Sequence, residues 1–183
     1  IFVKKSQMEE LRDLIGDKKL FEIKPFVRKT AGIVTTGNEV YHKRIKDEFT
    51  PVVKEKLAKY GVEVIGHETV YDDTEMIANA IRKLKDMGCE LILCTGGMSV
   101  DPDDLTPKAI SITAQKYVTY GTPVLPGAMF ALSYFEDGTP IMGLPGSVMY
   151  CEKTVFDLIL PRALANVETD KRTIASFGHG GLL

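Results

Sequence analysis

The sequence lacks the features that identify nucleic-acid-binding and membrane proteins. Its 183 residues carry a formal net charge of −2, and Lys and Arg are spread along the chain, so there is no basic patch for nucleic acid. No apolar run approaches the roughly 18 to 20 residues that a membrane span needs, and the first residues contain no signal-peptide core. We therefore expect a soluble, cytoplasmic protein without a nucleic-acid or membrane partner.

Cysteine and histidine are also scarce, which argues against a disulfide framework and a zinc site. The three cysteines, Cys89, Cys94 and Cys151, are an odd number without a CxxC spacing, so we expect buried free thiols. The three histidines form no HxxxH or HxH pair, so we expect ordinary surface or hydrogen-bonded side chains. The P-loop lysine motif and the GxGxxG dinucleotide fingerprint are absent as well.

The composition that remains is that of one compact domain with short flanking segments. Hydrophobic residues make up 44% of the chain, enough for a full core. Residues 1–29 have a weak helical pattern and then an extended segment at 20–27, and because the chain starts at Ile1 we expect an appendage or the remnant of a preceding domain. Residues 30–166 form the predicted domain, and residues 167–183, which end in a Gly-rich stretch, form a C-terminal tail.

Three short apolar runs, at residues 31–35, 62–67 and 91–95, have the length and composition of buried strands. Each run is followed by a segment with helical periodicity. After the first run, several apolar residues fall on one helical face that ends at Gly61. These residues are Phe49, Val52, Val53, Leu57 and Tyr60.

Two further helices follow the second and third runs. Residues 72–75, Asp-Asp-Thr-Glu, have the spacing of a capping box for a helix that ends at Gly88. Thr106 and Pro107 supply an N-cap and a first-turn proline for a helix that reaches to about Lys116.

The second half of the domain predicts a hairpin and a last helix. Residues 129–135 and 140–144 flank a turn at 136–139, and the last helix spans about 147–160. Alternating strands and helices with one hairpin indicate an α/β fold with a mostly parallel sheet between helices. We therefore expect a three-layer α-β-α architecture with one antiparallel hairpin.

In such a sheet the strand-to-helix turns meet at one edge, where the ligands of open α/β sheets bind. Backbone amides and hydroxyl groups in glycine-bearing turns suit an anion such as phosphate. Four such turns would lie at this edge: Thr36-Gly37, Thr95-Gly96-Gly97, Pro126-Gly127 and Pro145-Gly146-Ser147. Five aspartates would lie beside them: Asp72, Asp73, Asp101, Asp103 and Asp104.

Carboxylates beside a phosphate need a cation between them. A carboxylate about 4 Å from a phosphate oxygen costs roughly 4 kcal/mol at an effective dielectric constant of 20, whereas a helix N-terminus offsets only about 0.3 to 1 kcal/mol. Oxygen ligands with phosphate favour Mg²⁺. A simpler interpretation remains open, because glycine after a strand is commonly a tight turn and aspartate is a common helix cap.

The residues from about Thr30 to Ala165 resemble the molybdopterin-binding domain family of molybdenum-cofactor biosynthesis. That family includes MoaB/Mog-type and MoeA-type proteins, gephyrin and, more distantly, the amino-terminal domain of CinA-like proteins. The resemblance rests on seven motifs in the family's order: Thr36-Gly37-Asn38-Glu39, Ile45-Lys46-Asp47, Tyr71-Asp72-Asp73, Cys94-Thr95-Gly96-Gly97-Met98-Ser99, Asp104-Leu105-Thr106-Pro107, Leu125-Pro126-Gly127 and Gly143-Leu144-Pro145-Gly146-Ser147.

The resemblance implies a pterin ligand with a terminal phosphate, molybdopterin, lodged across the strand ends. In Mog-type members two aspartates serve the Mg²⁺-dependent adenylylation of molybdopterin by ATP, and the motifs place these catalytic and metal-binding residues at Asp72 and Asp104. In MoeA-type members the same crevice takes molybdate and inserts it into the adenylylated pterin. The residues that match the substrate-binding loops are Thr36, Gly37, Glu39, Thr95, Gly96, Gly97, Ser99, Gly127, Pro145, Gly146 and Ser147.

The chain mixes features of the family's subtypes. Thr-Gly-Gly-Met-Ser-Val and Gly-Leu-Pro-Gly are similar to MoeA-type members, whereas Asp-Asp-Leu-Thr-Pro is similar to Mog-type or CinA-like members. Ala128 and Met129 stand where MoeA-type members carry Lys-Pro, and Ser147-Val148 replaces Asn-Pro. The resemblance also implies a homo-oligomer, a trimer or a dimer, and other cofactor-assembly proteins or a molybdoenzyme as partners.

Three functions remain open on the sequence. The first is a transferase of cofactor assembly, of the molybdopterin adenylyltransferase or molybdotransferase type. The second is a module without catalysis that binds the pterin or finished cofactor and delivers it. The third is a CinA-like nucleotide pyrophosphatase, although Met98-Ser99-Val100 stands where that group continues with Gly-Pro-Thr.

Overall fold

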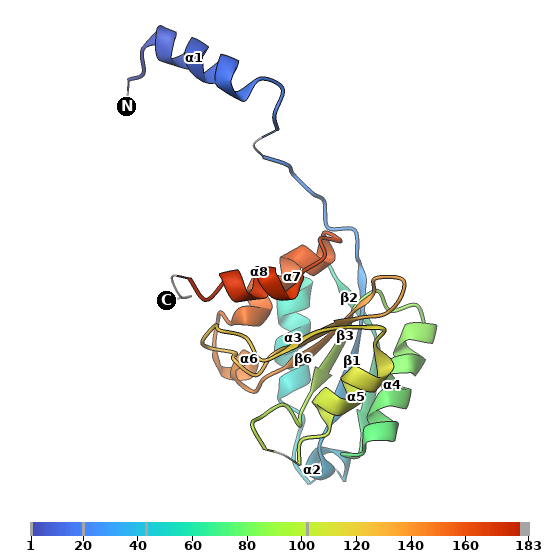
Figure 1. The fold of residues 1–183 in the computed structure, drawn as a ribbon. Helices are drawn as coiled ribbons and strands as arrows, with labels where there is room; N and C mark the ends of the chain where they lie inside the picture. Colours follow the sequence, from blue (N-terminus) through green and yellow to red (C-terminus); the bar gives the residue numbers. More distant parts are fainter. Residues whose placement is uncertain (1, 20, 43, 102, 180–183) are drawn as a thin grey trace.

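The computed structural model describes residues 2–19, 21–42, 44–101 and 103–179. In this part of the chain six strands form one sheet, in the order β2-β1-β3-β6-β5-β4 (Figure 1). The strands are β1 (Thr30–Thr36), β2 (Glu63–Val70), β3 (Ile92–Thr95), β4 (Lys116–Tyr120), β5 (Ala131–Tyr134) and β6 (Pro140–Leu144).

Strand directions bring several strand ends to one edge of the sheet. β1, β2, β3 and β6 are parallel to one another, β5 is antiparallel to β6, and β4 is antiparallel to β5. β4 therefore runs in the same direction as the four parallel strands. The mostly parallel sheet and the antiparallel β5–β6 hairpin predicted from the sequence are confirmed, and the carboxyl ends of five strands share one edge.

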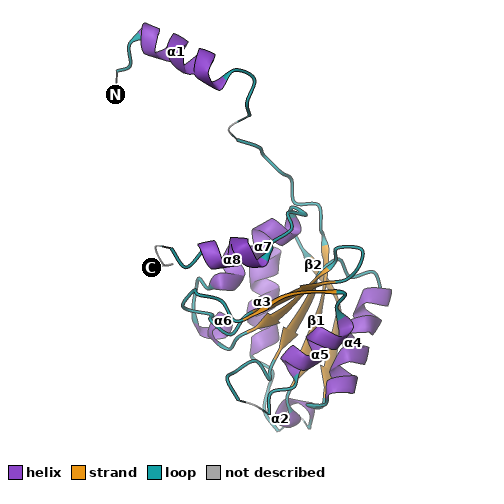
Figure 2. Ribbon diagram, viewed as in Figure 1, coloured by secondary structure: helices purple, strands orange, loops and turns teal. Residues whose placement is uncertain are grey.

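Helices cover both faces of the sheet, as Figure 2 shows. One core cluster joins the sheet to α3 and α7, and the other joins it to α4 and α5. This confirms the predicted three layers. The described helices are α1 (Lys5–Ile15), α2 (Asn38–Tyr41), α3 (Phe49–Ala58), α4 (Thr74–Asp86), α5 (Thr106–Thr113), α6 (Ser147–Tyr150), α7 (Val155–Leu164) and α8 (Lys171–Ser176).

The apolar periodicity of the sequence accounts for the helix faces that are buried. Val53 and Leu57 of α3 and Ile77 and Ile81 of α4 are fully buried against the sheet. Each such side chain contributes about 1.5–3 kcal/mol through removal from water. The burial of Cys89 and Cys94 as free thiols confirms the prediction for these two cysteines, whereas the free thiol Cys151 is only half-buried.

Two helix predictions were wrong at their ends. The helix predicted to reach about Lys116 ends at Thr113, and Lys116 instead opens β4, which pairs with β5. The run from Tyr117 to Tyr120 consists of aromatic and β-branched residues, which favour a strand, so these residues pair with a neighbouring strand and do not continue the helix.

The last helix, predicted over 147–160, is two helices. α6 ends at Tyr150, and α7 starts anew after Thr154. The hydroxyl of Thr154 accepts a hydrogen bond from the amide of Phe156, and the Asp157 carboxylate accepts one from the amide of Thr154. This capping box defines a fresh helix start, which the sequence analysis missed. α8 lies within the predicted C-terminal tail.

The amino-terminal arm, described over residues 2–19 and 21–25, stands apart from the domain (Figure 1), whereas Phe26 packs against Tyr60 and the amide of Val27 donates to the carbonyl oxygen of Leu164. Its predicted helical pattern is confirmed as α1, in which no residue is buried. None of the described helices combines the length and apolar character that a membrane crossing requires.

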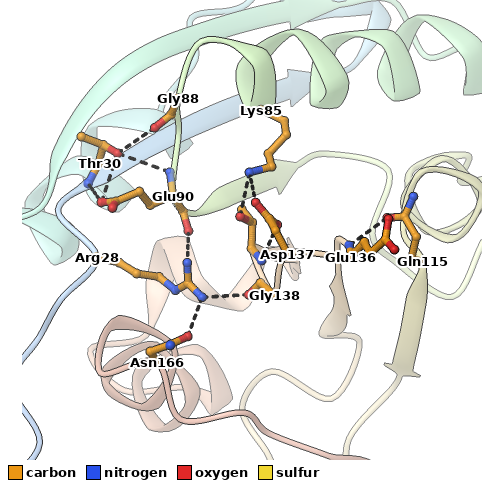
Figure 3. Close-up of polar contacts among 11 residues, drawn as sticks. Arg28, Thr30, Lys85, Gly88, Glu90, Gln115, Glu136, Asp137, Gly138 and Asn166 are labelled. Carbon is orange, nitrogen blue, oxygen red and sulfur yellow. Dashed lines mark hydrogen bonds and ion pairs between the residues drawn. The ribbon is translucent and has the colours of Figure 1, made fainter.

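Arg28 joins this arm to the domain at the edge of the sheet where β1 and β3 begin. Its guanidinium donates hydrogen bonds to the carbonyl oxygens of Gly138 (2.8 Å) and Glu90 (3.2 Å) and to Asn166 Oδ1 (2.8 Å), as Figure 3 shows. A further bond goes from Nε to the carbonyl of Ala163 (3.1 Å). Three chain segments are thereby held to one side chain.

Candidate functional site

The site at the carboxyl edge of the sheet begins with a glycine turn after β3. Gly96 adopts a φ of +87°, and a Cβ at this position would lie 2.2 Å from the carbonyl oxygen of Thr36. Gly97 adopts a φ of +53°. Only glycine combines these backbone angles with so close an approach, so the turn packs directly against the end of β1.

Three side-chain oxygens surround the turn, and we call them the oxygen cluster: Thr36 Oγ1, Asp72 Oδ1 and Thr106 Oγ1. The two hydroxyl oxygens lie 3.3 Å apart. A Cβ on Gly97 would lie 2.9 Å from Thr106 Oγ1 and 3.5 Å from each of the other two oxygens. The lack of a side chain at Gly97 therefore keeps the space between these oxygens open.

Asp72 is the member of the oxygen cluster whose side-chain oxygen lacks a hydrogen bond. Its Oδ1 is buried and has no hydrogen-bond partner among the described residues. Its backbone amide donates to Asn38 Oδ1 at 3.2 Å, which holds the residue at the crevice. Burial raises the pKa of the Asp72 carboxyl, and the negative charges of Asp104 and Asp73 raise it further. The surroundings disfavour a carboxylate here unless a cation is present.

Asp104 lies on the other side of the turn. Its carboxylate accepts a hydrogen bond from the amide of Ser99, and the hydroxyl of Tyr120 donates to the carbonyl oxygen of Ser99. A hollow of about 400 Å³ opens beside these residues, with Lys108 and Met129 in its wall. The crevice therefore contains two carboxylates, hydroxyl groups, a glycine turn and one nearby lysine.

Two of the predicted helix caps were misplaced, and both errors concern crevice residues. The capping-box spacing from Asp72 to Glu75 is wrong, because the N-cap of α4 is Asp73, the other aspartate expected as a cap; its carboxylate accepts from the amide of Met76, and Asp72 is left for the crevice. The N-cap of α5 is Leu105 rather than Thr106. The Thr106 hydroxyl instead lies against that of Thr36, because a contact across the crevice replaced the local cap.

The side-chain donors at the crevice are carboxylate and hydroxyl oxygens, the ligand type that Mg²⁺ prefers. Within the described ranges, no group of three or more His, Cys, Asp and Glu side chains is placed to hold a metal ion. Mg²⁺ keeps several waters and takes one or two carboxylates together with phosphate. The unpaired Oδ1 of Asp72, with Asp104 nearby, is a donor set of this kind.

The other residues predicted for the site are distributed along the same edge. Gly127 packs against Thr154 and Val155, at the start of α7. Ser147 opens α6, and its hydroxyl oxygen is buried without a partner in the described part of the chain. Pro145 and Gly146 precede it after β6. No described hydrogen bond joins these residues to the oxygen cluster.

Three further predicted residues lie next to β1 and β3. Gly37 adopts a φ of +133° at the end of β1, and Glu39 is exposed in α2. The hydroxyl of Thr95 is fully buried and donates to Thr35 Oγ1 at 3.3 Å and more weakly to the carbonyl of Val34. Thr95 thus contacts the interior of the sheet through its side chain.

A polar network beneath the crevice was not predicted. Thr35 Oγ1 lies 2.9 Å from His67 Nε2, 3.2 Å from Asp47 Oδ2 and 3.2 Å from Thr50 Oγ1. Burial by itself raises the pKa of Asp47, but hydrogen bonds from Thr50, Phe49 and Thr35 outweigh it and hold the pKa below its ordinary value. The hydrogen-bonded state predicted for the histidines is confirmed for His67.

Sequence reasoning also missed Asn38, Thr106 and Tyr120 as residues of the site. Asn38 and Thr106 belong to motifs that carried the family resemblance, so their side-chain oxygens were available as a signal. Two adjacent threonines at the end of the apolar strand β1 were another such signal. Tyr120 had none, because its contact with Ser99 depends on β4, which the sequence did not predict.

Residues 32–165 match the family described as a probable molybdopterin-binding domain. The match covers most of the chain and includes every residue of the oxygen cluster. The chain therefore belongs to this family of molybdenum-cofactor biosynthesis domains.

Solved structures agree with the fold. The crystal structure of the molybdopterin biosynthesis enzyme MoaB from Thermus thermophilus is 25% identical, with a TM-score of 0.65, and the alignment covers 78% of this chain and 98% of that one. The tungsten cofactor synthesizing protein MoaB from Pyrococcus furiosus has a TM-score of 0.62 at 18% identity, over 79% of this chain and 99% of that one. The α/β architecture is thus the one found in MoaB proteins.

Curated proteins with similar sequences are named CinA-like proteins. A CinA-like protein from Mycolicibacterium vanbaalenii is 38% identical over 82 residues, which is 44% of this chain and 19% of that protein. A CinA-like protein from Mycobacterium tuberculosis is 34% identical over 86 residues, 46% of this chain and 20% of that protein. The similarity spans only about a fifth of the length of these relatives.

Proposed function

We propose that the crevice at the carboxyl edge binds molybdopterin and that the protein takes part in assembly of the molybdenum cofactor. The observation that carries the proposal is the Asp72 carboxylate, which has a buried, unpaired oxygen beside the glycine turn Gly96-Gly97. Amides of such a turn suit a phosphate, and a carboxylate next to phosphate needs a cation. The family match supports a pterin as the carrier of that phosphate.

Asp72 and Asp104 would hold Mg²⁺, with the hydroxyl groups of Thr36 and Thr106 beside it. Bound there, the ion would supply positive charge for phosphate oxygens. Asp72 already presents its oxygen to the crevice. The amide of Ser99 fixes the carboxylate of Asp104 on the other side of the turn. The two aspartates are the residues proposed as catalytic.

The proposed reaction is a group transfer. In adenylylation, a phosphate oxygen of molybdopterin attacks the α-phosphorus of ATP and pyrophosphate leaves. In the related transferase reaction, the two dithiolene sulfurs of the adenylylated pterin would bind molybdate with release of water, and hydrolysis would release the adenylyl group as AMP. The protein's part in either reaction is to position the groups and to balance charge. The glycine turn would hold the anionic end of the ligand, and Gly127, Pro145, Gly146 and Ser147 would complete the rim.

Incubating the protein with molybdopterin, Mg-ATP and molybdate tests the proposal, with adenylylated pterin and transferred metal as the products to be measured. If neither forms, the protein is not an enzyme of this type. Pterin binding without turnover, unchanged in Asp104→Ala, would instead favour a module that delivers the pterin to another protein. If the proposal holds, removing either carboxylate weakens Mg²⁺-dependent activity far more than it weakens pterin binding.

A second candidate is the nucleotide pyrophosphatase activity that the resemblance to CinA-like proteins implies, and the similarity to proteins named CinA-like lends it weak support. The same pair of carboxylates would then serve hydrolysis of a diphosphate bond. Hydrolysis of ADP-ribose by the native protein, lost in Asp72→Asn, would support this function, and a protein inert toward ADP-ribose excludes it. For either function we also propose a homo-oligomer, a trimer or a dimer, which sedimentation analysis would detect.

A further inference from the structure

Three aromatic rings form a cluster at the rim of the crevice. Tyr41 and His42 lie at the end of α2, and Tyr71 directly follows β2. Their ring centroids are 5.3 Å (Tyr41–His42), 6.0 Å (Tyr41–Tyr71) and 6.1 Å (His42–Tyr71) apart, with interplanar angles of 77°, 80° and 72°. These are edge-to-face contacts, which stabilise aromatic pairs. We call the three side chains the aromatic rim.

The aromatic rim is exposed although its rings pack together. Tyr41 is 42% exposed and Tyr71 is 40% exposed. Both elements that carry it are tied to Asp72, because Tyr71 is its chain neighbour and Asn38, in α2, accepts the hydrogen bond from its amide. A partly apolar surface of exposed aromatic rings is therefore fixed beside the carboxylate proposed to bind Mg²⁺.

Positive charge lies next to the aromatic rim. A groove of about 620 Å³ runs between α2 and the end of β2, with Tyr41, Arg44, Lys46 and Asp47 in its wall. The Asp47 carboxylate accepts hydrogen bonds from Thr35, Phe49 and Thr50. Arg44 and Lys46 are exposed, and neither forms an ion pair with any residue that the structure describes. An aromatic surface next to free cations is the combination that binds a ring bearing an anion.

We propose that the aromatic rim is a stacking site for a flat heteroaromatic ring that carries a phosphate, with Arg44 and Lys46 beside its negative charge. The proposal rests on the proposed function, since it assigns the ring to a ligand whose phosphate lies near Asp72. Every such ring offers a π-face, so a nucleotide base and a pterin share this chemistry. The two sources are separated by the ligands used in the test.

The test measures the affinity of the native protein and its variants for adenosine monophosphate, a pterin monophosphate and ribose 5-phosphate, all with Mg²⁺. Ribose 5-phosphate has the phosphate without the ring. We expect Tyr71→Leu and Tyr41→Leu to weaken binding of one ring-bearing ligand about tenfold or more, and to leave ribose 5-phosphate unchanged. The ligand that the variants bind more weakly shows whether the stacked ring is a nucleotide base or a pterin. Tyr71→Phe, which keeps the ring face, should bind like the native protein.

Tyr60→Leu is the matched control. Tyr60 also forms an edge-to-face pair, with Phe26 at 5.3 Å, but it follows α3 at the opposite edge of the sheet. The stacking site is refuted if Tyr71→Leu binds both ring-bearing ligands as tightly as Tyr60→Leu does, or if it loses ribose 5-phosphate to the same degree. If the native protein binds all three ligands with equal affinity, the stacking site is refuted but the proposal for the crevice is not. Native protein that binds none of them refutes both.

Discussion

Asp72 is a side chain whose charge the folded protein disfavours. Its carboxyl group is partly buried, faces the charges of Asp104 and Asp73, and keeps one oxygen without a partner. A carboxyl group with a raised pKa binds its proton more tightly in the folded state, so its charged form lowers stability at neutral pH. Such a cost at a crevice is typical of residues retained for function.

We therefore expect Asp72→Asn to raise the free energy of unfolding at pH 7, because it removes a charge that burial and the neighbouring carboxylates of Asp104 and Asp73 disfavour; the gain should be about 1 kcal/mol, the usual order of magnitude for a single substitution. The gain should shrink as the pH falls through the raised pKa and be absent below the ordinary value of 3.8. Urea unfolding at several pH values measures it. The exposed Asp17→Asn serves as the control, and an Asp72→Asn gain that persists at low pH would contradict the electrostatic explanation.

Gly97 allows a second prediction for a single residue. Alanine there would need a φ of +53° and would bring its Cβ to 2.9 Å from Thr106 Oγ1. At Gly61 the φ is +67° and an added Cβ would have no atom within 4 Å, so alanine there measures the cost of the positive φ without a steric clash. We expect Gly61→Ala to lose about 1–2 kcal/mol of stability and Gly97→Ala to lose more. Equal losses in urea unfolding would show that the oxygen cluster yields to the extra methyl group.

Among the elements, the loop between β1 and α3 depends on Asp47. One oxygen of its carboxylate accepts hydrogen bonds from the amides of Phe49 (2.9 Å) and Thr50 (3.0 Å) at the start of α3, and the other accepts from the Thr35 hydroxyl. This loop carries α2, and with it Asn38 and two rings of the aromatic rim, Tyr41 and His42. Asp47 therefore connects the sheet, a helix start and the crevice.

Asp47→Ala should destabilise the protein more than the loss of an ordinary helix cap, which costs about 0.5–2 kcal/mol. Asp170→Ala is the matched control, since Asp170 accepts from the amide of Thr173 at the start of α8 without contacting the network. Because the pKa of Asp47 is lowered, its contribution is present above pH 3.8 and is lost as the pH falls through the lowered value. Equal losses at pH 7 would contradict a role beyond capping.

At the scale of the whole molecule, the arm and the domain meet at Arg28. The described residues before Phe26 are exposed apart from Ile15. Arg28 itself bonds to carbonyl groups of three separate segments. The stability of the domain should therefore depend on Arg28 and not on the residues before Phe26.

Removing residues 1–25 should change the free energy of unfolding by no more than about 0.5 kcal/mol, as for other surface changes. Arg28→Ala in the full chain should lower it by about 1.5–3 kcal/mol, the range for hydrogen bonds from a charged group. Arg82→Ala, which removes an exposed arginine bonded to Asn79, controls for charge. A large loss on truncation would mean that the arm packs on the domain.

Sequence patterns predicted the elements that rest on local rules. The buried strands β1 and β3 and the apolar faces of α3 and α4 follow from runs and periodicities within one segment. The patterns failed where distant residues compete. Residues Lys116–Tyr120 form a strand because they pair with β5. Thr106 does not cap α5, because its hydroxyl group contacts that of Thr36 across the crevice.

By itself, the sequence determined the α/β class, the parallel direction of the first strands and the motifs that place the chain in the molybdopterin-binding family, because each depends on residues that are close together in the chain. Only the tertiary structure decided which of the five aspartates has a buried oxygen without a partner in the described part of the chain. Asp73 caps α4 and Asp104 bonds to the amide of Ser99, while Asp72 keeps a bare oxygen beside two threonines from other elements. Hydrogen-bond partners and burial depend on segments far apart in the chain, and no local pattern contains them.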